Sequence, residues 1–127
     1  MAVYYELPIY KSLHSLVLAL IKQAKNLPKD YKYGLGQPLI HDTMEMLRKL
    51  FRVNSVPDKE QFIKEFIDTA ELVRAELRIM KDLRCMSVET ISELQPKLEG
   101  IMKQAYGWLR SVAPDAVVYG YFSRKTD

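Results

Sequence analysis

The sequence predicts an all-α protein, in which four antiparallel helices form an up-down-up-down bundle. Apolar residues recur at spacings of three and four in four successive segments, the pattern of helices with one buried stripe. The connections between the segments are short and contain proline, asparagine or serine, which interrupt helices. No pattern indicates a parallel sheet, and segments of roughly 20 residues with short connections pack most simply as a bundle.

The first helix is predicted to begin at Pro8 and to end near Asn26. Proline suits the first turn of a helix, because its missing N–H would be unpaired there in any case. Pro28 prevents the helix from continuing. The buried stripe consists of Leu13, Leu16, Val17, Leu20, Ala24 and Leu27.

The second helix is predicted to begin between Tyr33 and Pro38, next to the glycine pair Gly34 and Gly36. This pair lacks the third glycine of a dinucleotide-binding loop and the Lys-Ser/Thr of a phosphate-binding loop, so an entry turn is the favoured interpretation. The apolar positions are Leu39, Ile40, Thr43, Met46, Leu47, Leu50 and Phe51. The residues that break the pattern are Asn54, Ser55 and Pro57.

The third helix is the longest and most regular of the predicted helices. Asp58 followed by Gln61 resembles a capping box, and the apolar pattern behind it extends to about Arg84. The stripe consists of Phe62, Phe66, Ala70, Val73, Leu77 and Met80.

The fourth helix is predicted to be capped by Ser87 and to end near Val112. Pro96 is expected to bend this helix or to mark a later start. The apolar positions are Ile91, Leu94, Leu98, Ile101, Met102, Ala105, Trp108 and Leu109. The bundle is therefore assigned to residues 1–113, and residues 114–127 to a tail that is extended or disordered.

Composition indicates one soluble globular domain in a reducing compartment. The chain has 127 residues, of which 48% are apolar and 28% charged. The single cysteine, Cys85, excludes an internal disulfide and is expected to be a buried thiol. The apolar run from Leu16 to Ile21 is too short for a signal peptide or a membrane span. We therefore expect a cytoplasmic protein that has no membrane partner.

The sequence contains no pattern typical of a catalytic or metal site. The two histidines, His14 and His41, have no second ligand at metal-binding spacing, although His41 and Glu45 share a helix face. The carboxylates of the third helix do not form the Glu-x-x-His pairs of di-iron bundles. We therefore expect no enzymatic activity, no cofactor and no metal.

Positive residues of the third helix are spaced so that they lie along one side. Arg74, Arg78, Lys81 and Arg84 follow one another at intervals of four, three and three. One interpretation is an ordinary solvated flank, in which Glu71 pairs with Arg74 or Arg78. The other is a polyanion-binding face, which is favoured because the second helix also ends in a basic cluster, namely Arg48, Lys49 and Arg52.

Four stretches in residues 7–112 resemble, in order, the signatures of a known family. These stretches are LPIYKSLHSLVLALIKQAKNLPKDYKYGLGQPL, LRKLFRVNS, LRIMKDLRCMS and QAYGWLRS. The family is the bacterial four-helix-bundle family. It contains the accessory variability determinant (Avd) proteins of diversity-generating retroelements and the proteins encoded in 23S rRNA intervening sequences.

The resemblance implies a homopentameric barrel that binds RNA or DNA and, in the retroelement branch, partners a reverse transcriptase. The positions that match family motifs are Arg52, Asn54, Arg74, Arg78, Lys81, Gly107 and Trp108. Tyr106 and Trp108 are expected at the oligomer interface, since large aromatic residues are common anchors there. The predicted nucleic-acid-binding residues are Arg48, Lys49, Arg52, Arg74, Arg78, Lys81 and Arg84.

The leading hypothesis is thus an accessory protein that binds nucleic acid largely without sequence preference. Two alternatives stay open: a stand-alone intervening-sequence bundle that associates with RNA, and a purely structural helical oligomer.

Overall fold

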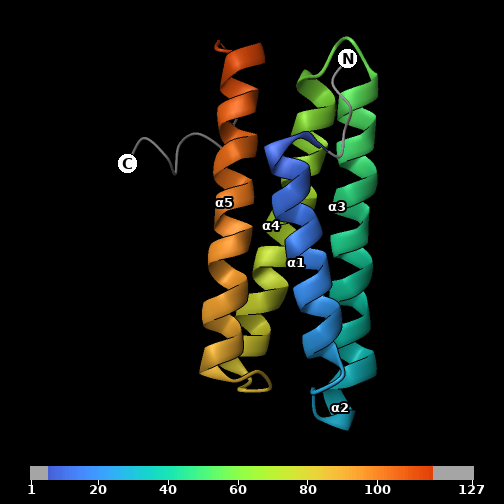
Figure 1. Cartoon of the computed structure of the whole chain (residues 1–127), viewed down its shortest axis with the longest axis vertical. Coiled ribbons are helices and arrows are strands. Elements are labelled where there is room, and N and C mark those ends of the chain that lie inside the picture. The colour runs from blue at the N-terminus through green and yellow to red at the C-terminus, as the bar shows by residue number, and fades with distance from the viewer. Residues whose placement is uncertain (1–5, 116–127) are drawn as a thin grey trace.

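The computed structural model describes residues 6–115, which form helices and contain no strand (Figure 1). The four long helices are α1 (Pro8–Ala24), α3 (Gln37–Ser55), α4 (Glu60–Asp82) and α5 (Val88–Val112). Between α1 and α3 lie the single turn α2 (Lys29–Tyr31) and the π-helical segment η2 (Lys32–Gly36). The predicted all-α fold with four long helices is confirmed for these residues.

The four long helices pack in a closed cycle. α1 contacts α3, α3 contacts α4, α4 contacts α5, and α5 contacts α1. Helices α1 and α4 therefore lie at opposite corners of the bundle. In Figure 1 the connection from α3 to α4 is at the top and the connection from α4 to α5 is at the bottom. The C-terminal ends of α3 and α4 are thus at opposite ends of the molecule.

Most residues of the predicted apolar stripes lie in the core, but Phe51 is 40% exposed, and Ile63 and Ile67, which the predicted stripes did not include, are buried. Leu16, Met46, Leu77 and Leu98, one from each long helix, are fully or almost fully buried. Thr43 is buried among them, and its hydroxyl donates to the Leu39 carbonyl oxygen at 2.7 Å. This bond within one helical turn satisfies the hydroxyl without a partner from another helix.

The glycine pair of the second segment forms the entry to α3, as predicted. Gly36 ends η2 and is buried against Leu27. A Cβ atom at position 36 would lie 2.7 Å from Cδ1 of Leu27, so glycine allows the segment to pack closely there.

The start of α4 differs from the prediction. The helix begins at Glu60, and its N-cap residue, Lys59, makes no side-chain capping bond, so the capping box predicted for Asp58 and Gln61 is wrong. The Lys59 ammonium instead donates to the carbonyl oxygens of Val53 at 2.8 Å and of Val56 at 2.7 Å. Lys59 thereby satisfies carbonyl groups at the C-terminal end of α3 that have no partner within the helix.

The predicted cap of α5 is confirmed. Ser87 Oγ accepts a hydrogen bond from the backbone N–H of Thr90 at 3.1 Å. Pro96 lies inside the helix, which begins at Val88, so Pro96 does not mark a later start. The predicted tail falls on residues 114–127, of which residues 116–127 lie outside the described part of the chain. No helix between residues 6 and 115 is long and apolar enough to cross a membrane.

Candidate nucleic-acid interface

The structure separates the seven predicted basic residues into three locations. The C-terminal end of α3 carries Arg48, Lys49 and Arg52, whereas Arg74 lies between α4 and α5. The C-terminal part of α4 and the turn after it carry Arg78, Lys81 and Arg84. Because the C-terminal ends of α3 and α4 lie at opposite ends of the bundle (Figure 1), the two basic clusters at these ends do not adjoin each other.

The cations at the end of α3 are partly engaged within the chain. Arg48 is exposed and pairs with Glu45 at 3.0 Å. Lys49 Nζ donates to Thr69 Oγ1 at 2.7 Å. The guanidinium of Arg52 lies 5.8 Å from the centre of the Phe62 ring. A small hollow of about 150 Å³ is lined by these cations and by Phe62, Glu45 and Glu65, so its lining has mixed charge.

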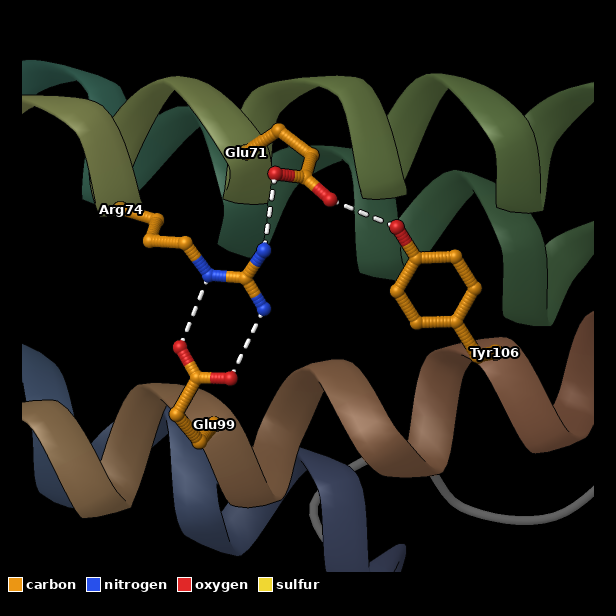
Figure 2. A network of polar contacts seen from close by, with 4 residues as sticks. All are labelled: Glu71, Arg74, Glu99 and Tyr106. Atoms are coloured by element: carbon orange, nitrogen blue, oxygen red, sulfur yellow. Dashed lines mark hydrogen bonds and ion pairs between the residues drawn. The ribbon is translucent and has the colours of Figure 1, made fainter. Parts of the chain in front are cut away.

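Arg74 belongs to a polar network that joins α4 to α5 (Figure 2). Its Nε and Nη2 donate to the two carboxylate oxygens of Glu99, each at 2.8 Å. Its Nη1 donates to Glu71 Oε1 at 3.0 Å, and Tyr106 Oη donates to Glu71 Oε2 at 2.6 Å. One guanidinium therefore contacts two carboxylates. Its contact with Glu99 is bidentate, a geometry that arginine favours with carboxylates.

These contacts keep Arg74 charged and occupied. Burial would lower the pKa of Arg74, but the hydrogen bond to Glu99 and the charges of Glu71 and Glu99 outweigh burial and raise the pKa. For Arg74 the structure supports the salt-bridged interpretation of the basic spacing. The expectation that Arg74 is an exposed phosphate contact does not fit this geometry.

Arg78, Lys81 and Arg84, here called the α4-end cations, are exposed. Within residues 6–115, no side-chain carboxylate lies within ion-pair distance of any of them. Lys81 and Arg84 line a hollow of about 580 Å³ together with the first turns of α5. The remaining lining residues are Met86, Ser87, Val88, Ile91, Ser92 and Gln95. This end of the bundle therefore presents positive charge that no carboxylate of residues 6–115 neutralises through an ion pair.

The backbone after α4 fixes the position of Arg84. The residue has a φ of 57°, which is the left-handed region. The backbone N–H of Arg84 donates to Lys81 O at 3.0 Å, and that of Cys85 donates to Met80 O at 3.1 Å. This pair of bonds is a Schellman motif, which usually places glycine at the left-handed position. An arginine stands there in this chain, at a cost in stability.

Cys85 follows directly and is buried, as predicted. Its thiol donates to the carbonyl oxygen of Met80 at 3.3 Å. Burial raises the pKa of the Cys85 thiol, so the protonated form predominates at neutral pH.

A carboxyl pair between α3 and α4 was not predicted from the sequence. Glu76 is hydrogen-bonded to Asp42, and its Oε1 is buried with no hydrogen-bond partner in the described chain. Burial is the main cause that raises the pKa of Glu76 to about 8, and the hydrogen bond with Asp42 and its negative charge add to it. Glu76 therefore keeps its proton over much of the neutral range.

The histidines and acidic residues form no metal centre in the described residues. Nδ1 of His41 lies 3.3 Å from Asp42 Oδ1, so its polar contact is with Asp42 and not with Glu45. Between residues 6 and 115, no group of three or more histidine, cysteine, aspartate or glutamate side chains is arranged to hold a metal ion.

The two aromatic residues predicted at an oligomer interface lie in different environments. Tyr106 is only 2% exposed and is part of the core, so it cannot anchor a contact with another chain in this conformation. Trp108 is half-buried against the core. It also lines an apolar hollow of about 210 Å³ with Leu7, Pro8, Ile9 and Gln104, so a role for Trp108 at an interface stays a prediction.

The contacts that sequence reasoning missed join residues far apart in the chain. Glu99 is 25 residues from Arg74, and Tyr106 is 35 residues from Glu71. The available signal was the acidic stretch of the fourth segment, which could have been placed beside the basic side of the third.

Comparisons of the chain with family models, curated proteins and solved structures found no match.

Proposed function

We propose that this protein is a nucleic-acid-binding accessory subunit of a diversity-generating retroelement. In this proposal it forms an antiparallel up-down-up-down bundle, assembles as a homopentameric barrel, and partners a reverse transcriptase during mutagenic reverse transcription. The resemblance of four sequence stretches to the family that contains the Avd proteins supports this proposal, and the same stretches are compatible with the intervening-sequence proteins of that family.

The observation that best supports nucleic-acid binding is that the α4-end cations are exposed and form no ion pair with the described residues. Arg78, Lys81 and Arg84 are exposed and have no ion-pair partner between residues 6 and 115, unlike Arg74. Unpaired cations on a surface attract phosphates, because each neutralised phosphate releases condensed counterions. The hollow beside Lys81 and Arg84 gives a strand room to approach both side chains.

Assembly would make these weak contacts effective. The formal charge of one chain is +3, so five copies carry five times three, or +15. Several equivalent cation clusters on one particle engage one polyanion with higher avidity than any single cluster. A barrel therefore compensates for the modest charge of the single chain.

Binding should depend little on base sequence. The chain contains no RNA-recognition signature, zinc knuckle or recognition-helix motif that could read base edges. Contacts from arginine and lysine to phosphates position a strand without reading it. Template choice would then belong to the reverse transcriptase.

The test is binding of a short single-stranded RNA to the Arg78→Ala/Lys81→Ala variant, measured by fluorescence anisotropy at low salt. We expect an affinity at least about tenfold below that of the parent, since two phosphate contacts are lost. Lys103→Ala, which removes one exposed charge from α5, is the control and should change affinity little. Unchanged affinity in a folded double variant would favour the purely structural oligomer.

The retroelement role has a separate test. The chain should co-purify with a reverse transcriptase encoded beside it, and variable and template repeats should flank the two genes. A location inside an rRNA operon, without such a partner, would instead favour the intervening-sequence alternative.

A further inference from the structure

The outer side of α4 carries an apolar ridge that is about half exposed in the described part of the chain. Leu72, Ile79 and Leu83, here called the α4 ridge, are each between 46% and 49% exposed. Their spacings of seven and four residues place them on one face of the helix, opposite the buried stripe. Burial of this apolar surface against a partner would lower the free energy relative to its exposure to water.

A second apolar face lies along the α1–α3 pair. The ring of Tyr10 stacks on that of Phe51 at 6.4 Å, which marks the side on which the two helices meet. Leu18 and Ile21 follow Tyr10 by eight and eleven residues, and therefore lie within about 80° of it on α1. The face, here called the α1–α3 face, consists of residues that are each between 40% and 48% exposed: Leu18, Ile21, Met44 and Phe51.

The two faces point in different directions. α1 and α4 lie at opposite corners of the bundle, because each contacts α3 and α5. The α4 ridge and the α1–α3 face of one molecule therefore cannot meet each other. They can meet only if one copy offers its ridge to the face of the next.

Charge favours this pairing over contact between like faces. α1 contains Lys11 and Lys22 and no acidic residue, and Lys25 directly follows it as the C-cap residue. The α4 ridge is bordered by Asp68 and Asp82, which are exposed. No ion pair within residues 6–115 involves any of these five side chains. Opposite charges around two apolar centres give a polar rim that selects the correct partner face.

We propose that copies of this chain associate head to tail, with the α4 ridge of one copy seated on the α1–α3 face of the next. This inference rests on the homo-oligomer proposed above, but not on nucleic-acid binding. A ridge of one helix fits the groove between two others, which is a common mode of helix packing. A contact between two different faces also repeats around a ring, whereas a two-fold contact stops at a dimer. Trp108 lies on α5, outside both faces, so any contact that it makes is additional.

The test uses two variants that each lose one face, with masses measured by light scattering. Leu72→Lys/Ile79→Lys blocks the ridge, and Leu18→Lys/Ile21→Lys blocks the α1–α3 face. The parent should have a multiple of the 14.8 kDa chain mass, and each variant alone should have the mass of one chain. An equimolar mixture should form a one-to-one dimer, because each variant retains the face that the other lacks, and the two blocked faces repel.

Each other outcome identifies what is wrong. If the parent is oligomeric and both variants keep its mass, this interface is wrong but the proposed homo-oligomer is not contradicted. If the parent is monomeric, both the interface and the homo-oligomer are wrong. If only one variant dissociates, the contact is two-fold and the head-to-tail arrangement is wrong. Two dissociated variants that do not combine when mixed also contradict the inference.

A charge exchange provides a second test, with milder changes at exposed positions, in case a lysine variant fails to fold. Asp68→Lys/Asp82→Lys and Lys22→Glu/Lys25→Glu should each raise the dissociation constant at least about tenfold, because like charges then face each other. The chain with all four changes should regain the parent's assembly. Loss of assembly in the fourfold variant, with helicity intact by circular dichroism, would contradict the charge pairing.

Discussion

The phenol of Tyr106 on α5 donates a hydrogen bond to Glu71 Oε2 on α4 at 2.6 Å. The other oxygen of Glu71 accepts a hydrogen bond from Arg74 (Figure 2). The phenol of Tyr106 therefore helps to fix the Glu71 carboxylate in the position in which it binds Arg74. Arg74 is therefore part of the packing between α4 and α5, and the candidate nucleic-acid surface begins at Arg78.

Replacing Tyr106 by phenylalanine should lower the free energy of unfolding by about 1–2 kcal/mol. The change removes a hydrogen bond to a charged acceptor and leaves Glu71 Oε2 in a partly buried place without its donor. Urea denaturation followed by circular dichroism measures the loss. Tyr33→Phe, at an exposed tyrosine of η2, is the matched control and should have no effect. Equal stabilities of the two variants would mean that water replaces the phenol without cost.

Arg74→Ala and Arg78→Ala should separate stability from binding. Arg74→Ala removes the bidentate pair with Glu99 and the bond to Glu71, so we expect a loss of roughly 1–2 kcal/mol in stability, reduced by partial exposure. Arg78→Ala removes no ion pair that involves a described residue and should leave stability within about 0.5 kcal/mol. RNA affinity should fall more for Arg78→Ala. The reverse ranking in denaturation and anisotropy would contradict this division of roles.

Stability should fall as pH rises from about 5 to about 8, because of Glu76. Its pKa is about 8 in the folded chain, against an ordinary value of 4.5. Between these values the folded state binds more protons than the unfolded state, so raising the pH favours unfolding. Well above pH 8, Glu76 is ionised in both the folded and the unfolded state, and the loss of stability from its ionisation is complete.

Thermal unfolding midpoints across this range measure the effect. Glu76→Gln keeps a group that can donate to Asp42 but does not ionise, so it should flatten the pH dependence and be more stable than the parent at pH 8 and above. Glu93→Gln, at an exposed carboxyl of α5, should follow the parent's curve. A parent midpoint that does not change with pH would show that Glu76 titrates normally.

Arg84→Gly should stabilise the fold while it weakens nucleic-acid binding. Glycine adopts the left-handed conformation at position 84 without steric cost, and we expect a gain of about 0.5–1 kcal/mol. Arg84→Ala removes the same charge but keeps a Cβ atom, so it should weaken binding equally without the gain. If both variants lose stability, the arginine side chain makes a stabilising contact that outweighs its backbone strain.

Local periodicity predicted the helices well, because the stripes from Leu13 to Leu109 alternate with polar residues at helical spacing. It also predicted the Ser87 cap, which depends on contacts within one turn. It failed at the start of α4, where Lys59 reaches back to α3 and the Asp58 side chain is not used. The pairing of Arg74 with Glu99 could not be predicted, because it depends on how α4 and α5 are aligned. Spacing alone placed four cations on one side, and it could not show which of them a neighbouring helix neutralises.

The most direct test of the account is a salt titration of RNA binding by the parent and by the triple variant Arg78→Ala/Lys81→Ala/Arg84→Ala. Two scrambled RNAs and the candidate template RNA should bind the parent with equal affinities. The logarithm of each affinity should fall linearly with the logarithm of salt concentration, with a slope of about −0.7 for each phosphate contact on a single strand. The triple variant should keep its fold and oligomeric mass and show a distinctly shallower slope. A parent slope near zero, an unchanged slope in the variant, or a strong preference of the isolated protein for the template RNA would contradict the proposal that the α4-end cations hold nucleic acid by charge.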